Sequence, residues 1–298
     1  MSAPPDLPLV SVVTPSYRQA DFIRATLDSV LGQDYPRIEY LVMDGGSDDG
    51  TVDILRSYGE RLRWVSEPDG GQAAAVNKGW ALAEGEILGW LNSDDRYTPG
   101  AVRRAVDYLA AHPEADGVYG HALLEALGGR ALGRFPTARA VDFRGMKGSC
   151  PIAQPSVFLR RSAVRRVGGL RNALHMVMDQ DLWLRLLRDG RLDFIDADQA
   201  VCLMHPGSKT SLGGRLRARE LAAVMTDACV WVNRVHLYDR AYATRHALPQ
   251  DDPGAPRLVA WERAYFRVLQ LLLFLGVNVL GAPWRLLRGP RGRRGDLG

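Results

Sequence analysis

The stretch LVSVVTPSYRQADFIRATLDSVLGQDYPRIEYLVMDGGSDDGT, residues 9–51, decides the fold. It opens with a β-rich run at 9–14, passes into a helical pattern at 21–31 and returns to an apolar run at 38–43. A strand, a helix and a second strand in this order predict two parallel strands joined by a crossing helix.

The same alternation continues as far as residue 111. Strands are expected at 62–66 and 86–91, and helices at 52–58, 72–83 and 99–111. We therefore predict an α/β fold with a mainly parallel central sheet and helices on both faces. In such sheets ligands bind beyond the carboxyl ends of the strands, so the residues that follow each strand are the candidates for chemistry.

Acidic or polar turns follow all four of these strands. The four turns are TPSYRQ, DGGSDDGT, EPDGGQ and NSDD. Each alone is ordinary turn chemistry. Together they place Asp44, Asp69, Asp94 and Asp95 on one edge of the sheet, where their mutual repulsion would be offset by a bound cation or a hydrogen-bonding ligand.

The motifs narrow the class of ligand. The chain has neither a GxGxxG turn nor a GxxxxGK[ST] loop, so the usual dinucleotide and P-loop cradles are missing. Adjacent carboxylates suit a hard divalent cation, Mg²⁺ or Mn²⁺, which often shares its coordination with phosphate oxygens. A metal-bridged diphosphate fits this edge better than a hydride cofactor.

Composition excludes several classes of protein. The 298 residues are 46% hydrophobic and 24% charged, which is ordinary for a folded chain with a large core. The net charge of +4 resides in the tail from Arg285 onward, and residues 1–284 are neutral overall. Because this charge follows an apolar stretch, it favours an anionic membrane surface over nucleic acid as a partner.

The C-terminal third has its own pattern. A helical pattern runs from 214 to about 238, and an apolar segment, predicted to be helical, follows at about 258–287, before the basic tail. Its uncharged part, 268–284, counts 17 residues, whereas a membrane span needs about 20. We expect this helix to lie on the membrane surface; packing as a soluble core or dimer helix and a true span are the alternatives.

Other features favour the cytoplasm. The three cysteines are isolated, which favours reduced thiols over bridges or a zinc site. The first residues, MSAPPDLPLV, lack the basic leader of a signal peptide. We expect the catalytic part at the inner face of the cell membrane.

The ordered series of motifs resembles a known family. Residues 9–51, then SEPDGGQAAAVNKGW and GWLNSDD, are similar to family 2 glycosyltransferases of the bacterial surface-polysaccharide type, and the likeness extends to about residue 211. The resemblance implies the GT-A fold, with a catalytic domain at 1–213 and a helical C-terminal extension at 214–298. It also implies an inverting, metal-dependent transfer from a nucleoside-diphosphate sugar, most simply a UDP-sugar.

The resemblance also implies roles for individual residues. Those that would bind the donor are Pro15, Tyr17, Asp44, Asp69, Lys78 and Asp94. Asp95 would bind Mg²⁺ or Mn²⁺, with His205 as a second group near the metal or the diphosphate. The chain departs from the common acidic motif at Asn92, where relatives frequently have Asp.

An acceptor half follows downstream. In CPIAQPSVFLRR, Gln154 and Pro155 would border the acceptor pocket, and in DQDLWLRLL, Asp179 would be the general base, with Asp181 as the rival. Both aspartates stand near an expected helix start, so capping is the structural alternative.

The implied acceptor is a glycan or a lipid-linked glycan of surface-polysaccharide synthesis. Two other functions compete with this hypothesis: a non-catalytic partner protein that retained the fold, and a nucleotidyltransferase. The retained Asp94, Asp95 and Asp179 oppose the first. The absence of a basic, glycine-rich loop after the first strand opposes the second.

Overall fold

A computed structural model describes residues 7–143, 145–146, 150–209 and 214–227 of the chain. The chain divides into two compact units. One contains Met1–Met146 and Cys150–His205, and the other contains Lys147–Ser149 and Pro206–Gly298. The first unit holds the whole sheet and all the strand-end motifs.

Strands and helices alternate through the first 111 residues, as the sequence predicts. They are β1 (Val10–Ser16), α1 (Ile23–Leu31), β2 (Ile38–Asp44), α2 (Thr51–Ser57), β3 (Arg63–Ser66), α3 (Gln72–Leu82), β4 (Ile87–Trp90), β5 (Arg96–Tyr97) and α4 (Ala101–Ala111). All four predicted strands and all four predicted helices are present within a few residues of their expected ends. The two-residue β5 was not expected.

The second half adds shorter and more irregular elements. They are β6 (Gly117–Ala126), β7 (Ala131–Arg134), β8 (Phe158–Arg160), α5 (Arg161–Val167), α6 (Met178–Asp189) and β9 (Leu192–Met204), with a 3₁₀ turn, η2, at Gln154–Ser156. The second unit contributes α7 (Gly214–Asp227), which lies where the sequence predicts a helix. The predicted apolar helix at about 258–287 and the basic tail lie outside the described residues.

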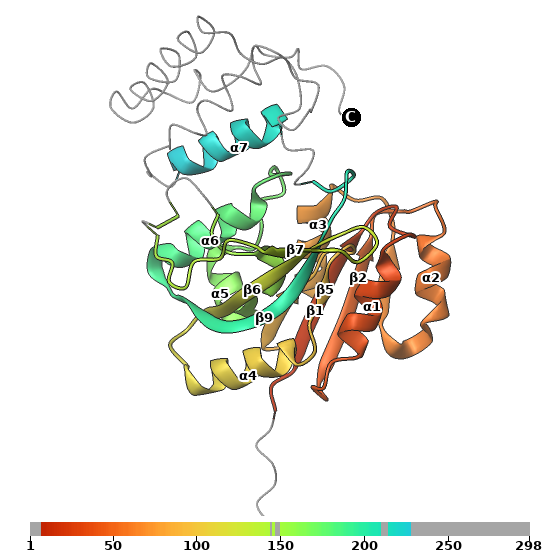
Figure 1. Ribbon diagram of the computed structural model, residues 1–298, viewed down its shortest axis with the longest axis horizontal. Helices are drawn as coiled ribbons and strands as arrows, with labels where there is room; N and C mark the ends of the chain where they lie inside the picture. Colours follow the sequence, from red (N-terminus) through yellow and green to blue (C-terminus); the bar gives the residue numbers. More distant parts are fainter. Residues whose placement is uncertain (1–6, 144, 147–149, 210–213, 228–298) are drawn as a thin grey trace, which may run out of the picture. The chain divides into compact units, whose positions relative to one another are not determined.

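One sheet connects the two halves of the first unit. Its order is β3-β2-β1-β4-β8-β6-β9-β5, and β7 pairs with the outer part of β6 (Figure 1). The strands β3, β2, β1 and β4 are mutually parallel, as are β6 and β9. The prediction of parallel pairing thus holds for the first half, whereas β8, β5 and β7 pair antiparallel and make the complete sheet mixed.

Alternation along β1 distributes the core over both faces of the sheet. Val12 packs in the cluster that contains Ile23 and Leu27 of α1 and Val102 of α4. Val13 points to the opposite face, against α3. There Gly79 permits close approach, because a Cβ at this position would lie 2.4 Å from Cγ1 of Val13.

The pairing of β6 with β9 contains an irregularity. Tyr119 pairs with Phe194 and Ala122 pairs with Ala200, so β9 takes six steps where β6 takes three. The extra residues of β9 form a β-bulge opposite His121 of β6. Beyond the bulge, β9 continues in register to Met204 and delivers His205 to the end of the strand.

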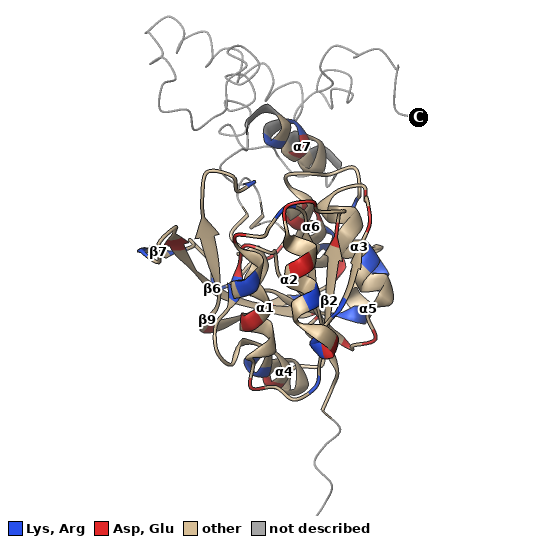
Figure 2. Cartoon of the chain, turned by 90° about the vertical axis from the view of Figure 1, so that its right-hand side faces the viewer, with Lys and Arg blue, Asp and Glu red and all other residues tan. Residues whose placement is uncertain are grey.

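Charged residues cover the helices without segregating by sign. Figure 2 shows Lys and Arg mixed with Asp and Glu along α1, α2 and α4. Ion pairs such as Arg103 with Asp34 and Arg56 with Asp53 join opposite charges on this surface. The hairpin of β6 and β7 stands out at the margin of the same view, and every residue of β7 is exposed.

Candidate functional site

The four strand-end motifs meet at one edge of the sheet. Ser16 pairs with Asp44, and Asp44 pairs with Ser66, so the ends of β1, β2 and β3 lie side by side. Strand β9 runs in the same direction as these strands, because β4 and β6 are both antiparallel to β8 and β9 is parallel to β6. His205 therefore arrives at this same carboxyl edge, which is the upper edge in Figure 1.

Asp44 is buried and organises the loop that follows it. It is 2% exposed. Its Oδ2 accepts hydrogen bonds from Ser66 Oγ at 2.6 Å and from the backbone nitrogens of Gly46 and Ser47, and its Oδ1 accepts from Ser47 Oγ at 2.6 Å. These bonds fix the direction of the carboxylate and of the loop. Pro15, the neighbouring residue predicted to bind donor, is buried within β1.

Tyr17 and Asp69 close over Gly45. A Cβ added at Gly45 would lie 3.3 Å from both Cδ2 of Tyr17 and Oδ2 of Asp69. Tyr17 is 56% exposed, so one face of its ring is available at the edge. Asp69 is oriented by the backbone nitrogen of Gly71, which donates to Oδ1 at 2.7 Å. An exposed aromatic ring beside a fixed carboxylate is a suitable place for a flat, hydrogen-bonding group.

Lys78 lies on α3, the helix that follows the loop containing Asp69. Its ammonium forms an ion pair with Glu67, which follows β3. The pair joins α3 to the EPDGG loop. Lys78 is thus brought near the predicted donor residues, with its charge directed to the loop rather than to Asp94 or Asp95.

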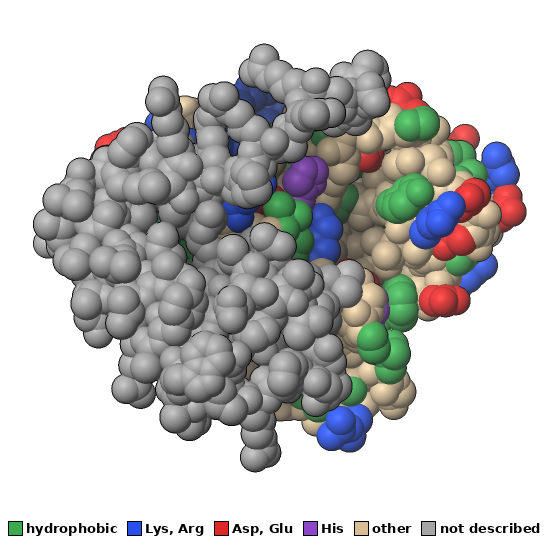
Figure 3. Space-filling model, turned by 90° about the horizontal axis from the view of Figure 1, so that it is seen from above, with side chains coloured by type: hydrophobic (Ala, Val, Ile, Leu, Met, Phe, Trp, Pro, Cys, Tyr) green, Lys and Arg blue, Asp and Glu red, His purple; other side chains and the backbone are tan. Residues whose placement is uncertain are grey.

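Asp94 and His205 meet at the centre of the edge. Nε2 of His205 lies 3.1 Å from Oδ2 of Asp94, and their side chains are 8% and 22% exposed, respectively. The His205 ring also packs on Phe22, with a centroid distance of 4.6 Å. Figure 3 looks down on the sheet's carboxyl ends, where histidine, basic and apolar side chains lie together on the coloured part of the surface.

Asp95 is next to Asp94 but is oriented inward. It is 7% exposed, and its two oxygens accept hydrogen bonds from Leu203 N and Asn92 Nδ2. Burial and the neighbouring Asp94 carboxylate raise the pKa of Asp95 well above its usual range. The predicted metal ligand is therefore held behind the edge, whereas Asp94, predicted to contact sugar hydroxyls, is the carboxylate beside His205.

The two candidate bases differ in their surroundings. Asp181 is 2% exposed and forms ion pairs with Arg185 at 2.7 Å and Arg171 at 3.3 Å. Asp179 is half-buried at the start of α6, and its Oδ1 accepts from Gln180 N at 2.8 Å. These contacts make Asp181 a structural carboxylate and disfavour it as a base.

Asn77 of α3 binds the segment that precedes α6 through hydrogen bonds. Its amide donates to Leu170 O and accepts from Leu170 N, at 2.8 and 2.9 Å, and it donates to Asn172 Oδ1 at 2.7 Å. His175, in the same segment, lies 3.7 Å from the Cβ position of Gly71. Neither residue was predicted: Asn77 lay inside a quoted motif, and His175 carried no motif at all.

The predicted acceptor residues lie at the end of β4. Gln154 begins η2, and its Nε2 donates to the carbonyl of Trp90 at 2.6 Å. Pro155 is buried beside it. The structure thus brings Gln154 directly to the NSDD motif, through contacts that the sequence did not predict.

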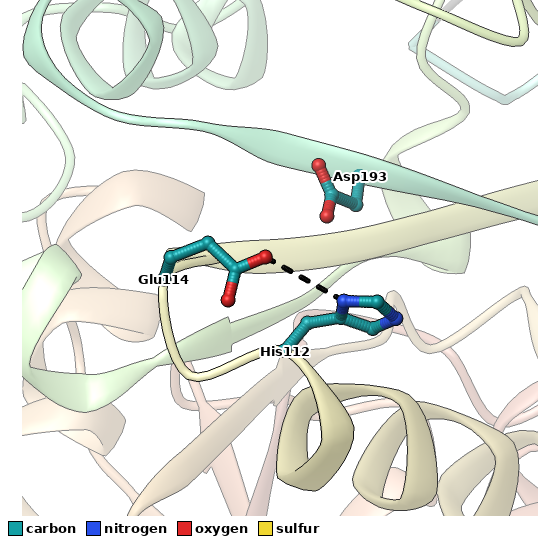
Figure 4. A group of neighbouring side chains, drawn as sticks. All are labelled: His112, Glu114 and Asp193. Carbon is teal, nitrogen blue, oxygen red and sulfur yellow. Dashed lines mark ion pairs between the residues drawn. The ribbon is translucent and has the colours of Figure 1, made fainter.

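A second group of possible metal ligands lies at the opposite end of the sheet. His112, Glu114 and Asp193 have ligand atoms within 4.8 Å of one another (Figure 4). Arg191 forms ion pairs with both Glu114 and Asp193, and His112 lies 3.5 Å from Glu114. Because an arginine already neutralises these carboxylates, we interpret the group as a structural ion-pair cluster.

Among the helices that the structure describes, none is long and apolar enough to cross a membrane.

Comparison with solved structures identifies the fold. The chain is similar to residues 1–349 of S. aureus TarS in complex with UDP-GlcNAc, with a TM-score of 0.64 and 19% identity over 93% of this chain and 82% of that one. It is also similar to the mannosyltransferase PcManGT of Pyrobaculum calidifontis in complex with GDP-Man and Mn²⁺, with a TM-score of 0.59 and 20% identity over 92% and 87%. The predicted GT-A fold is thereby confirmed.

Curated proteins that are similar in sequence are named as glycosyltransferases. An uncharacterized glycosyltransferase of Rickettsia felis is 28% identical over 201 residues, which are 63% of this chain and 33% of that protein. An uncharacterized glycosyltransferase of Mycobacterium tuberculosis is 34% identical over 182 residues, 60% of this chain and 68% of that protein.

A third relative is named for its pathway. The glycosyltransferase TuaG of Bacillus subtilis, named for teichuronic acid biosynthesis, is 37% identical over 132 residues, 43% of this chain and 52% of that protein. The chain thus spans about a third of the Rickettsia felis protein and about half of TuaG.

The family model for glycosyl transferase family 2 matches residues 11–168, which is more than half of the chain and includes every strand-end motif. The chain belongs to glycosyl transferase family 2.

Proposed function

We propose that the protein is an inverting, metal-dependent glycosyltransferase that uses a nucleoside-diphosphate sugar, most simply a UDP-sugar. The observation that carries the proposal is the contact between Asp94 and His205, on the same sheet edge as Tyr17, Gly45 and Asp69. One end of this edge suits a nucleobase, and the other suits the charged diphosphate.

The nucleoside would lie against Tyr17. A flat ring would lie against the exposed Tyr17 side chain, and Asp69 and Asp44 would supply fixed carboxylates for its polar groups. TarS was solved in complex with UDP-GlcNAc and PcManGT in complex with GDP-Man, so both uridine and guanosine donors occur on this fold.

A divalent cation would be held by Asp94 and His205. Oδ2 of Asp94 and Nε2 of His205 lie 3.1 Å apart, in side chains that are 22% and 8% exposed, and a carboxylate with an imidazole favours Mn²⁺ over Mg²⁺. Asp95, whose oxygens accept from Asn92 and Leu203, would support the turn. When bound, the cation supplies Lewis-acid stabilisation of the diphosphate that leaves.

Asp179 would act as the general base. It would take the proton of the acceptor hydroxyl as that oxygen bonds to the anomeric carbon and the bond from this carbon to the diphosphate breaks. A single displacement of this kind inverts the configuration. Support comes from the half-buried position of Asp179 at the start of α6 and from the Asn77 clamp that joins the preceding segment to α3.

The acceptor is proposed to be a glycan or a lipid-linked glycan of surface-polysaccharide synthesis, as the name of TuaG suggests. The apolar residues 268–284 and the arginine-rich tail would hold the chain at the inner membrane surface. Flotation of the full chain with vesicles tests this. Binding to vesicles rich in anionic lipid, lost at high salt, is expected; absence of binding would contradict it.

The donor site is tested by thermal shift with UDP, TDP and GDP, each with Mn²⁺, Mg²⁺ or a chelator. A ligand that binds the folded state raises Tm by an amount that grows with its concentration relative to Kd. We expect a metal-dependent rise with one nucleotide. A flat response to all nine combinations would contradict the proposal.

A further inference from the structure

The side chain of Asn92 is the centre of four hydrogen bonds. Its Oδ1 accepts from Trp90 Nε1 at 2.9 Å and from Gln72 Nε2 at 2.6 Å. Its Nδ2 donates to Gln154 Oε1 at 2.9 Å and to Asp95 Oδ2 at 3.2 Å. Gln72 belongs to the EPDGGQ loop and Trp90 to the end of β4. Asp95 belongs to the NSDD motif and Gln154 to the acceptor-side turn η2.

The direction of each amide follows from its partners. An indole nitrogen can only donate, so Oδ1 of Asn92 must face Trp90 and Nδ2 must face Gln154. A backbone carbonyl can only accept, so Nε2 of Gln154 must face Trp90 O and Oε1 must face Asn92. Trp90, Asn92 and Gln154 therefore form a closed ring of three hydrogen bonds.

We propose that Asn92 is a positioning residue that locks the acceptor-side turn η2 to the donor edge through this ring. The inference rests on the proposed function only where it treats Gln154 as part of the acceptor side. It explains the departure from the common acidic motif, because position 92 must both accept and donate.

Aspartate at position 92 is the informative change. A carboxylate would still accept from Trp90 and Gln72, but its second oxygen would face two acceptors, Gln154 Oε1 and Asp95 Oδ2. Asn92→Asp thus breaks the link to η2 and leaves the other side of the network intact. Gln154→Leu breaks the same hydrogen bond from the other side and also removes the bond from Gln154 to Trp90 O.

Amide hydrogen exchange measures how often the turn η2 opens. The amides of Ser156 and Val157 donate to Ala153 O and Gln154 O within the turn, so their exchange reports its opening. We expect exchange at these two amides to accelerate about tenfold in Asn92→Asp, as for the loss of one buried hydrogen bond, and more in Gln154→Leu, which loses two. Exchange in α4 should remain unchanged, and Gln72→Leu should leave Ser156 and Val157 as in the wild type.

Kinetics separate positioning from stability. With the sugar nucleotide identified by thermal shift, Asn92→Asp should lower kcat about tenfold while donor KM and the Kd for nucleotide with Mn²⁺ stay within about threefold. Unchanged exchange at Ser156 and Val157, or equal acceleration in α4, would overturn the inference. Failure of the wild type to bind any nucleotide would instead count against the proposed function, and the exchange result would stand.

Discussion

The imidazole of His205 lies 3.1 Å from the carboxylate of Asp94, although 111 positions separate the two residues in the chain. The contact exists because β4 and β9 run in the same direction and end at the same edge. It joins the last residue of the first unit to the NSDD motif and defines the place where we expect the metal.

Replacement of Asp94 by Ala should abolish the metal-dependent part of the nucleotide thermal shift, and replacement of His205 by Ala should reduce it. Each change removes one of the two adjacent ligand atoms. The matched control is His112→Ala, which alters the ion-pair cluster at the opposite end of the sheet and should leave the shift intact. Retention of the full Mn²⁺ effect in Asp94→Ala would refute the assignment.

Replacement of Asp179 by Asn should lower turnover by about 10²–10⁴-fold, the usual contribution of a general base. Nucleotide binding should persist, because the change keeps the size of the side chain and leaves the donor edge untouched. Release of nucleoside diphosphate from the bound sugar donor measures the first quantity, and calorimetric titration measures the second. Normal turnover in this variant would exclude Asp179 as the base.

Replacement of Asp181 by Asn should act on stability instead. It leaves Arg185, whose side chain is 17% exposed, without its buried carboxylate partner. Loss of one partner of a buried ion pair costs about 3 kcal/mol of unfolding free energy. Urea unfolding measures this loss. A stable variant with impaired turnover would return Asp181 to the list of candidate bases.

Replacement of Gly45 by Ala should weaken nucleotide binding about tenfold, because the added methyl carbon would lie 3.3 Å from both Tyr17 and Asp69 and displace them. Tyr17→Phe keeps the ring and should bind almost normally, whereas Tyr17→Ala should bind poorly. Calorimetric titration with the nucleotide and Mn²⁺ distinguishes these variants. Equal affinity of Gly45→Ala and the wild type would place the base elsewhere.

Replacement of Gly79 by Ala should destabilise the fold by about 2 kcal/mol, since the new Cβ would overlap Val13. Val13→Ala in the same chain should restore part of the loss, because it removes the methyl groups that collide. The two single variants and the double variant, compared by urea unfolding, form a double-mutant cycle. If the two changes in unfolding free energy simply add in the double variant, α3 does not press on β1 at this point.

The first half of the fold could be predicted because its signals are local. Each strand from β1 to β4 is followed by an acidic or polar turn, and each helix shows its own periodicity. The second half lacks such signals: β8 has three residues, and β6 pairs with β9 across a long separation in the chain. Pairing of that kind depends on tertiary packing, not on local pattern.

The site could be predicted at the level of motifs but not of side-chain direction. The motif NSDD predicted two carboxylates at the edge; Asp94 lies there beside His205, and Asp95 lies behind it. Which one faces outward depends on the turn after β4 and on Leu203 N, a partner 108 positions away from Asp95. The hydrogen bond that Asn92 donates could not be predicted either, because its acceptor, Gln154, lies 62 positions downstream.

The bulge in β9 has an evolutionary consequence. Side chains on a strand alternate between the two faces of a sheet, so the loss or gain of one residue near positions 195–199 would turn His205 away from Asp94. The effect would arise in the middle of β9, some distance along the chain from the site. Homologues that keep this histidine should therefore tolerate changes of residue type there far better than changes of length.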